Sequence, residues 1–241
     1  MTELTAGHTV KRFDNEMRKL HDYVLDMGER VKKQILDAVK ALDDEDPIAA
    51  REVIRRDRDI NQLDVEIDEE IIRLIAKRQP MAKDLREILA IGKIVTDLER
   101  VGDQARKIAR LVIQLYDHEG PPPNSQLLRD IPHMAAFCHE MVTNSLRAFD
   151  TLNLELAVET IKQDKELGEE FKAGLRRLST YLMEDARSVG HVVEVVLGLR
   201  ALERIGGHAK NIGGYVVFLI TGRDVRHESL KAIMTEVLGQ Q

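Results

Sequence analysis

Two acidic side chains four residues apart, Glu99 and Asp103, are the pair in this sequence best placed to do chemistry together. On an α-helix, a spacing of four residues puts both carboxylates on the same side. Two such charges repel each other by about 0.2–0.5 kcal/mol on an exposed helix. A hard cation would reverse the sign of that interaction, because carboxylate oxygens are its preferred ligands. The spacing therefore indicates a candidate cation site.

A third ligand for this site would come from a neighbouring segment. Asp57 and Asp59 are two residues apart on a predicted helix, so they point to different sides and at most one of them can join the pair. Asp57 is the candidate. The same acids also fit a plain charged surface, because Arg106 and Lys107 follow Asp103 at the spacings that suit helical ion pairs. Taken alone, an E-x-x-x-D pair is weak support for a metal.

The block around Glu99 occurs a second time, 104 residues later. Leu98-Glu99-Arg100-Val101-Gly102 matches Leu202-Glu203-Arg204-Ile205-Gly206. The apolar positions around it, at the helical spacings of three and four, recur in register: Ile88, Ile91, Val95, Leu98, Gly102, Ala105, Ala109 and Val112 align with Val192, Val195, Leu199, Leu202, Gly206, Ala209, Gly213 and Val216. A solvated face need not keep Glu and Arg at matched positions, so the repetition favours a functional interpretation.

The second copy is not complete. Glu203 keeps the first acid, but Gly207 stands where the first copy has Asp103. One carboxylate is therefore missing from the second candidate cation site. His208, beside Gly207, and Asp164, which aligns with Asp57 at an offset of 107, are the candidates to replace it. The alternative for His208 is an ordinary polar surface residue.

Helices must position these side chains, and the breaks between them are visible in the sequence. Three consecutive prolines, at 121–123, cannot continue a helix and favour a stiff, extended spacer. Weaker breaks divide the rest of the chain into six long helices, predicted at 10–42, 47–78, 82–118, 125–150, 153–182 and 190–221, with a short final helix at 227–238. Asp46-Pro47 and Asn153 are typical of helix starts.

The first helices of the two halves also align, at an offset of 111, and offsets that change only between helices place the insertions in loops. The sequence therefore predicts an all-α fold of tandem duplicated three-helix bundles: 1–119, a Pro-rich linker at 120–124, and 125–241. Gly206 and Gly213 lie on the core seam of the sixth helix. We expect them to let a neighbouring helix approach closely.

Composition excludes several classes of protein. Hydrophobic residues make up 43% and aromatic residues only 4% of the chain, which favours long helices over sheets. The net charge of −6 disfavours nucleic-acid binding. Acids are interleaved with the most basic patch of the chain, which consists of Arg51, Arg55, Arg56 and Arg58. The first residues lack the blocks of a signal peptide, and the longest apolar run, 215–220, is too short to span a bilayer. Export and membrane insertion are disfavoured.

Other reactive residue types give no catalytic pattern. Cys138 aligns with the core residue Met27, so we expect a buried, inert thiol. The histidines show neither H-E-x-x-H nor the E-x-x-H spacing of a ferritin-type di-iron centre. No phosphate-binding glycine loop of the known nucleotide-binding types is present. The sequence predicts a protein that is not an enzyme.

The repeated block, running from Leu98 to Ala105 and again from Leu202 to Ile212, resembles the repeated motif of the PhoU proteins, regulators of bacterial phosphate uptake. Two further segments agree with this family: Arg12-Phe13-Asp14, with Leu20, and the segment from Arg78 to Arg86. The resemblance covers nearly the whole chain, in order.

The resemblance implies a cytoplasmic, all-helical, often dimeric protein. Such proteins link the phosphate ABC transporter ATPase to a phosphate sensor histidine kinase and hold starvation signalling off when phosphate is plentiful, so that contact with the membrane is made only through partners. It also implies transition-metal clusters, one per bundle, at the acidic motifs. Two alternatives to an adaptor remain: a metal-binding bundle that takes iron, zinc or Mg/Mn, and a structural helical scaffold.

Overall fold

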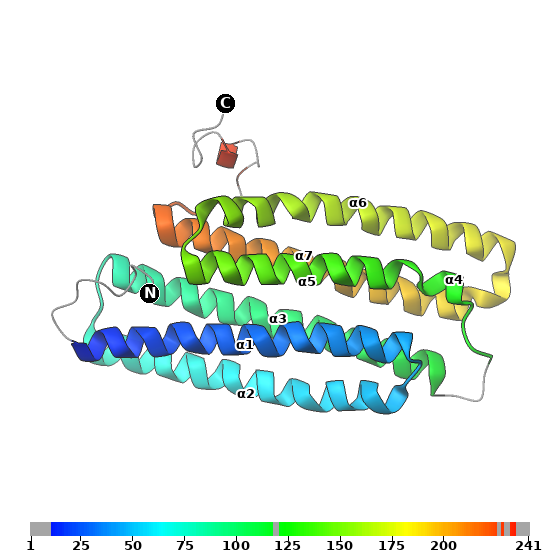
Figure 1. The fold of residues 1–241 in the computed structure, drawn as a ribbon, viewed down its shortest axis with the longest axis horizontal. Helices are drawn as coiled ribbons and strands as arrows, with labels where there is room; N and C mark the ends of the chain where they lie inside the picture. The colour runs from blue at the N-terminus through cyan, green and yellow to red at the C-terminus, as the bar shows by residue number, and fades with distance from the viewer. Residues whose placement is uncertain (1–10, 118–120, 226–227, 229–231, 235–241) are drawn as a thin grey trace.

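A computed structural model of the chain describes residues 11–117, 121–225, 228 and 232–234. All the long elements are helices, running along the long axis of the molecule (Figure 1). In chain order they are α1 (Lys11–Asp43), α2 (Pro47–Arg78), α3 (Lys83–Tyr116), α4 (Ser125–Leu128), α5 (Asp130–Thr151), α6 (Leu154–Glu184), the 3₁₀ turn η2 (Ala186–Ser188) and α7 (Val189–Thr221). The predicted all-α fold is confirmed, and the helix ends agree with the predicted ones to within two residues at most ends.

The helix starts predicted from the sequence are formed by side-chain caps. The Asp46 carboxylate accepts hydrogen bonds from the backbone N–H groups of Ile48 (2.8 Å) and Ala49 (3.0 Å) at the start of α2. Asn153 Oδ1 accepts one from the N–H of Leu156 (2.9 Å) at the start of α6. Each cap satisfies backbone donors that the helix itself leaves unpaired.

One prediction of helix extent was wrong. The helix expected at 125–150 is interrupted at Arg129, which separates the short α4 from α5. Pro132 explains the break, because its ring has no N–H to donate to the carbonyl four residues back, at Leu128, and would clash with it. The final helix expected at 227–238 falls mostly outside the described residues. Within that range the structure describes 228 and 232–234, and residues 232–234 are helical.

The helices form two sets of three that lie side by side, α1–α3 and α5–α7 (Figure 1). Besides the contacts within each set, α3 packs against α7 and α1 packs against α5. The helices α3 and α7 run in opposite directions, so that Leu111 near the end of α3 meets Gly198 near the start of α7. One continuous core of buried apolar residues runs through both sets, and the Pro-rich segment is therefore not the only connection between them.

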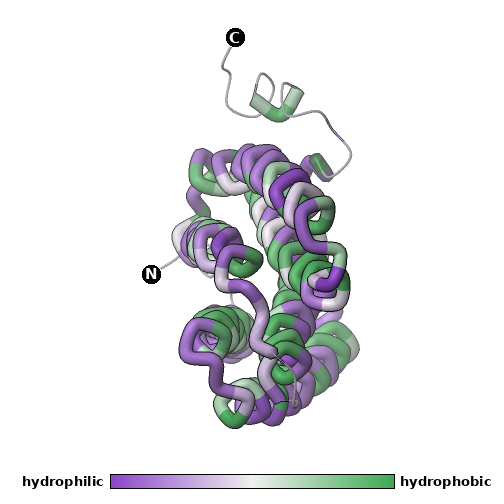
Figure 2. The backbone as a smooth tube through the Cα atoms, turned by 90° about the vertical axis from the view of Figure 1, so that its right-hand side faces the viewer, coloured by the Kyte–Doolittle hydropathy of each residue, from purple (hydrophilic) through white to green (hydrophobic). Residues whose placement is uncertain are grey.

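The apolar seam of each helix faces this core. In the end-on view, hydrophobic and hydrophilic residues alternate around the helices (Figure 2). Every apolar position that the two repeats share in α3 and α7 is buried. Cys138 of α5 is buried too, and its thiol donates to the carbonyl oxygen of Leu202 (3.0 Å). Burial raises the pKa of this thiol far above its ordinary value, so the thiolate is not available for chemistry.

Two glycines of α7 permit close packing against α6, as the sequence predicts. A Cβ atom at Gly206 would lie 2.1 Å from Leu167 Cδ2, and one at Gly213 would lie 2.9 Å from the backbone oxygen of Ala157. No helix within the described ranges combines the length and the apolar character needed to cross a membrane.

Candidate functional site

Asp57 is the centre of the first acidic motif. Its carboxylate is almost fully buried, with 1% of the residue exposed. Gln34 Nε2, from α1, donates to Asp57 Oδ1 (3.0 Å) and to the carbonyl oxygen of Gly102 on α3 (3.2 Å). Gly102 lies directly against this acid, since a Cβ there would be in van der Waals contact with Asp57 Oδ1, at 3.5 Å. One hydrogen-bonded cluster thus joins all three helices of the first set.

Arg106 supplies the positive charge that this buried acid requires. Its Nη1 lies 3.0 Å from Asp57 Oδ2, and its Nη2 donates to Asp103 Oδ1 (2.5 Å). The guanidinium therefore bridges two of the three predicted metal ligands. A buried carboxylate without such a partner would be strongly unfavourable.

Glu99 lies next to this bridge without sharing it. Its ion-pair partner is Arg100, at 3.4 Å. Burial raises the pKa of Glu99 above its ordinary value, the carboxylate of Asp103 raises it further, and Asp64 and Asp57 add to the effect, partly offset by Arg100. Asp64, from α2, was not among the predicted site residues. The carboxylates are thus crowded enough for each to raise the cost of ionising Glu99.

The side chains do not form a metal site in this arrangement. In the part of the chain that the structure describes, no three His, Cys, Asp or Glu side chains are gathered as the ligands of one ion. Asp57 and Asp103 face an arginine, which takes the place that a cation would fill. Metal binding at Glu99, Asp103 and Asp57 stays a prediction, and it requires Arg106 to move.

The second motif repeats this arrangement in reduced form. Asp164 on α6 pairs with Lys210 on α7, with 2.7 Å between Oδ2 and Nζ. By the repeat offsets, these residues are the counterparts of Asp57 and Arg106. Lys210 has no second acid to bridge because Gly207 replaces the counterpart of Asp103, and a Cβ at Gly207 would meet open space. Glu203 pairs instead with Arg200, at 2.9 Å.

His208 contacts an acid of the other three-helix set. Its Nδ1 lies 2.6 Å from Asp97 Oδ1, and Asn211 Nδ2 donates to the same oxygen (3.1 Å). Asp97 is on α3, so this cluster ties α7 to the other three-helix set. Sequence reasoning missed Asp97, although one signal was present: its counterpart in the second repeat is Ala201, so the repeats differ where the two sets meet.

The two motifs open onto the same hollow, between α3 and α7. It has a volume of about 820 Å³. Equivalent residues of the two repeats line it in pairs: Arg100 and Arg204, Asp103 and Gly207, Gln104 and His208, Lys107 and Asn211. Of the six predicted site residues, Asp103, Asp164, Glu203 and His208 line this hollow, whereas Glu99 and Asp57 do not.

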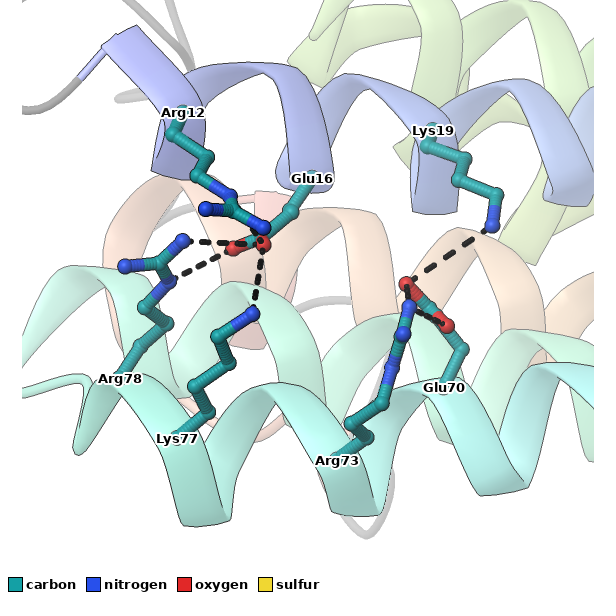
Figure 3. Close-up of polar contacts among 7 residues, drawn as sticks. All are labelled: Arg12, Glu16, Lys19, Glu70, Arg73, Lys77 and Arg78. Atoms are coloured by element: carbon teal, nitrogen blue, oxygen red, sulfur yellow. Dashed lines mark hydrogen bonds and ion pairs between the residues drawn. The ribbon is translucent and has the colours of Figure 1, made fainter.

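A second charged cluster lies away from this hollow, where the start of α1 meets the end of α2 (Figure 3). Glu16 accepts two hydrogen bonds from Arg78, at 2.7 and 3.0 Å, and lies 3.8 Å from both Arg12 and Lys77. The bond from Arg78 lowers the pKa of Glu16 below its ordinary value. Arg12 and Arg78 come from two segments whose sequences resembled the PhoU family, and the structure brings them together. Beside them lies a second carboxylate, that of Glu70 on α2, which forms ion pairs with Lys19 of α1 and Arg73 of α2.

Two equivalent three-helix sets, whose charged motifs meet in a shared hollow, define a duplicated helical-bundle protein. The family model described as "PhoU domain" matches the chain twice, over residues 24–112 and 131–216. These two matches cover most of the chain and coincide with the two structural repeats. The chain belongs to the PhoU family.

Known relatives resemble the chain over nearly its full length. A "Phosphate-specific transport system accessory protein PhoU homolog" from Pseudomonas putida is 44% identical, over 98% of this chain and 91% of the relative. The protein of that system from Escherichia coli K12 is 34% identical, over 91% of this chain and 90% of the relative. The crystal structure of PhoU from Pseudomonas aeruginosa superposes with a TM-score of 0.81 at 42% identity, covering 88% of this chain and all of that one.

Proposed function

We propose that this chain is a non-enzymatic accessory and regulator of a phosphate-specific transport system. The observation that carries the proposal is the 44% identity to the Pseudomonas putida accessory protein across 98% of the chain. The similarity to the crystal structure described as the phosphate transport system regulatory protein PhoU from Streptococcus pneumoniae supports it, with a TM-score of 0.80 at 28% identity.

The proposed regulation depends on two partners of the chain. The chain acts in the cytoplasm, bridges the ATPase of the phosphate ABC transporter and a phosphate sensor histidine kinase, and keeps starvation signalling off while phosphate is plentiful. Phosphate status at the transporter changes which complex is favoured, which is a shift of population among states that already exist. The helical faces of the two sets offer surfaces for two partners, and a homodimer would double them.

Gene replacement tests the regulatory role. The Pseudomonas putida gene for the 44% identical relative is replaced by the gene for this chain, and phosphate-starvation genes are measured in rich and poor phosphate. We expect normal repression in rich phosphate and normal induction in poor phosphate. Expression that is derepressed in rich phosphate, with the chain present at normal levels, would contradict the proposal.

Direct binding tests the bridging role separately. The purified chain is immobilised, and the transporter ATPase and the cytoplasmic part of the histidine kinase are passed over it, singly and together. Binding of both in one complex supports bridging, and binding of neither favours a structural scaffold. The molecular mass in solution, from light scattering, tests the homodimer.

Metal binding is a second candidate function for the first motif. The crowding of Glu99, Asp103, Asp64 and Asp57, which raises the pKa of Glu99, is the observation that favours it. Iron, zinc or Mg/Mn would relieve that crowding if Arg106 moved away. The second motif is the weaker candidate, because Gly207 provides no ligand. Elemental analysis of the purified chain, with Glu99→Ala and Asp103→Ala, tests this: metal content that neither change lowers would rule it out.

A further inference from the structure

The hollow between α3 and α7 continues into a smaller one of about 340 Å³ toward the end of α3 and the start of α7. Gln104, Lys107 and Arg204 line both hollows, so the two form one groove. The smaller hollow lies within the size range of small-molecule sites, which is about 300–1,000 Å³. We call the two hollows together the α3–α7 groove.

The smaller hollow is cationic, although the chain as a whole is acidic. Its lining includes Lys107, Arg110, Arg200 and Arg204, against a single acid, Glu194. The whole chain, by contrast, has 36 basic and 42 acidic residues. An excess of one sign in a recess with apolar walls concentrates the electrostatic field and attracts ions of the opposite sign.

Two of these arginines have no partner of their own. Within the described part of the chain, neither Arg110 nor Arg204 forms a hydrogen bond or an ion pair. Lys107 bonds only to the neutral amide of Gln104, at 3.1 Å. Arg200 differs, because it pairs with Glu203. Three cationic groups thus line the groove with their charge uncompensated.

The sequence explains why Arg204 is unpaired. An arginine on a helix can pair with an acid three or four residues away, but the neighbours of Arg204 at those spacings include no acid: Arg200, Ala201, Gly207 and His208. Its counterpart in the first repeat, Arg100, has Asp103 three residues later. The replacement of that acid by Gly207 removes a potential metal ligand and, at the same time, shifts the charge of the groove toward positive.

Another hollow with basic residues shows what a compensated recess looks like. It lies between α1 and α2 and contains Arg30, Lys33 and Arg56. Each of these has a carboxylate within 3.1 Å, provided by Asp26 or Asp37. Such a recess offers an anion no free charge, so the α3–α7 groove is the better anion site of the two.

We propose that the α3–α7 groove binds a multivalent phosphate-bearing anion, held by Lys107, Arg110 and Arg204. Guanidinium groups present forked donors that match phosphate oxygens, and several cations along one groove suit a chain of phosphates better than a single one. Leu111 and Leu197 also line the smaller hollow and give it an apolar wall against which a nucleoside can pack. The ligand is therefore an inorganic oligophosphate or a nucleotide. The inference does not depend on the proposed regulatory function, which assigns no ligand to the chain.

Calorimetric titration of the full chain tests this, with tripolyphosphate, ATP and orthophosphate as probes, at low and at physiological ionic strength. We expect tripolyphosphate and ATP to bind more tightly than orthophosphate and more tightly at low salt, where screening is weaker. Tighter binding of ATP than of tripolyphosphate identifies the nucleotide as the natural class, and equal binding identifies the phosphate chain alone. Failure of both to bind at millimolar concentration would overturn the proposal.

Substitutions locate the site. Arg110→Gln with Arg204→Gln removes two charge-assisted contacts and is expected to weaken binding at least about tenfold. The matched control is Arg58→Gln with Arg147→Gln, since both are exposed arginines that line neither hollow.

Glu194→Gln should tighten binding, and Gly207→Asp, which fits into open space, should weaken it. Equal affinity in the groove variants and in the control would overturn the proposal, and unchanged thermal unfolding shows that each variant is folded.

Discussion

At the scale of single residues, the repeated motif is best understood as a balance of buried charge. Asp57 and Asp164 occupy equivalent places, and each meets a base from the last helix of its own set. The pairs differ in burial: the side chain of Asp57 is 2% exposed and that of Asp164 is 29% exposed. The first pair therefore depends far more on its partner than the second.

This difference predicts unequal costs for equivalent substitutions. Arg106→Gln leaves Asp57 buried and unpaired and should lower the free energy of unfolding by about 3 kcal/mol, near the lower end for buried pairs because Arg106 is partly exposed. Lys210→Gln, its counterpart, should cost about 1 kcal/mol or less, because Asp164 can be solvated. Urea unfolding of both variants measures this. Equal losses would contradict the account of the motif.

The cluster around Glu16 gives a prediction for pH. Arg78 holds the pKa of Glu16 below the ordinary value of 4.5, so ionised Glu16 stabilises the fold. That contribution is fully present above pH 4.5 and is lost as the pH falls through the lowered pKa. Wild type and Glu16→Gln should thus differ in urea unfolding at pH 6 and converge toward pH 3. A difference that is constant over this range would show that Glu16 does not contribute through its charge.

At the scale of elements, glycine positions decide how closely α6 and α7 approach. Gly213 faces the backbone of α6, whereas Gly207 faces open space. Both lie in the interior of α7, so alanine should improve intrinsic helix propensity at either position by up to about 1 kcal/mol. Packing opposes this gain at Gly213 alone.

These two glycines form a matched pair for a stability measurement. Gly213→Ala should destabilise the chain by about 1–3 kcal/mol, because the added methyl group meets the backbone oxygen of Ala157, which cannot rotate away. Gly207→Ala should be neutral or stabilising. Thermal unfolding of the two variants tests the packing argument, which fails if Gly213→Ala is the more stable variant.

Sequence reasoning predicted the helices and their caps because local signals determine them. Apolar spacing indicated each long helix, and the side chains of Asp46 and Asn153 indicated two starts. The break at Arg129 was missed because the apolar pattern continues across it, although Pro132 was a visible cause. Periodicity identifies the face that enters a core, but it does not say which polar face meets another set of helices.

At the scale of the whole molecule, the meeting of the two repeats is what the sequence did not reveal. The sequence predicts the duplicated motifs as two separate sites, one per bundle. In the structure α3 packs against α7, parts of both motifs line one groove, and Asp97 joins His208 and Asn211 across the boundary. The two sets are therefore coupled through packed helices as well as through the Pro-rich segment.

The central claim is that this chain, as a member of the PhoU family, represses phosphate-starvation signalling. The most direct test is deletion of its gene in the organism of origin, with starvation-gene expression and phosphate uptake measured in phosphate-rich medium. The account predicts derepressed expression, restored to the basal level when the gene is returned on a plasmid. Expression and uptake that are unchanged by the deletion would contradict it.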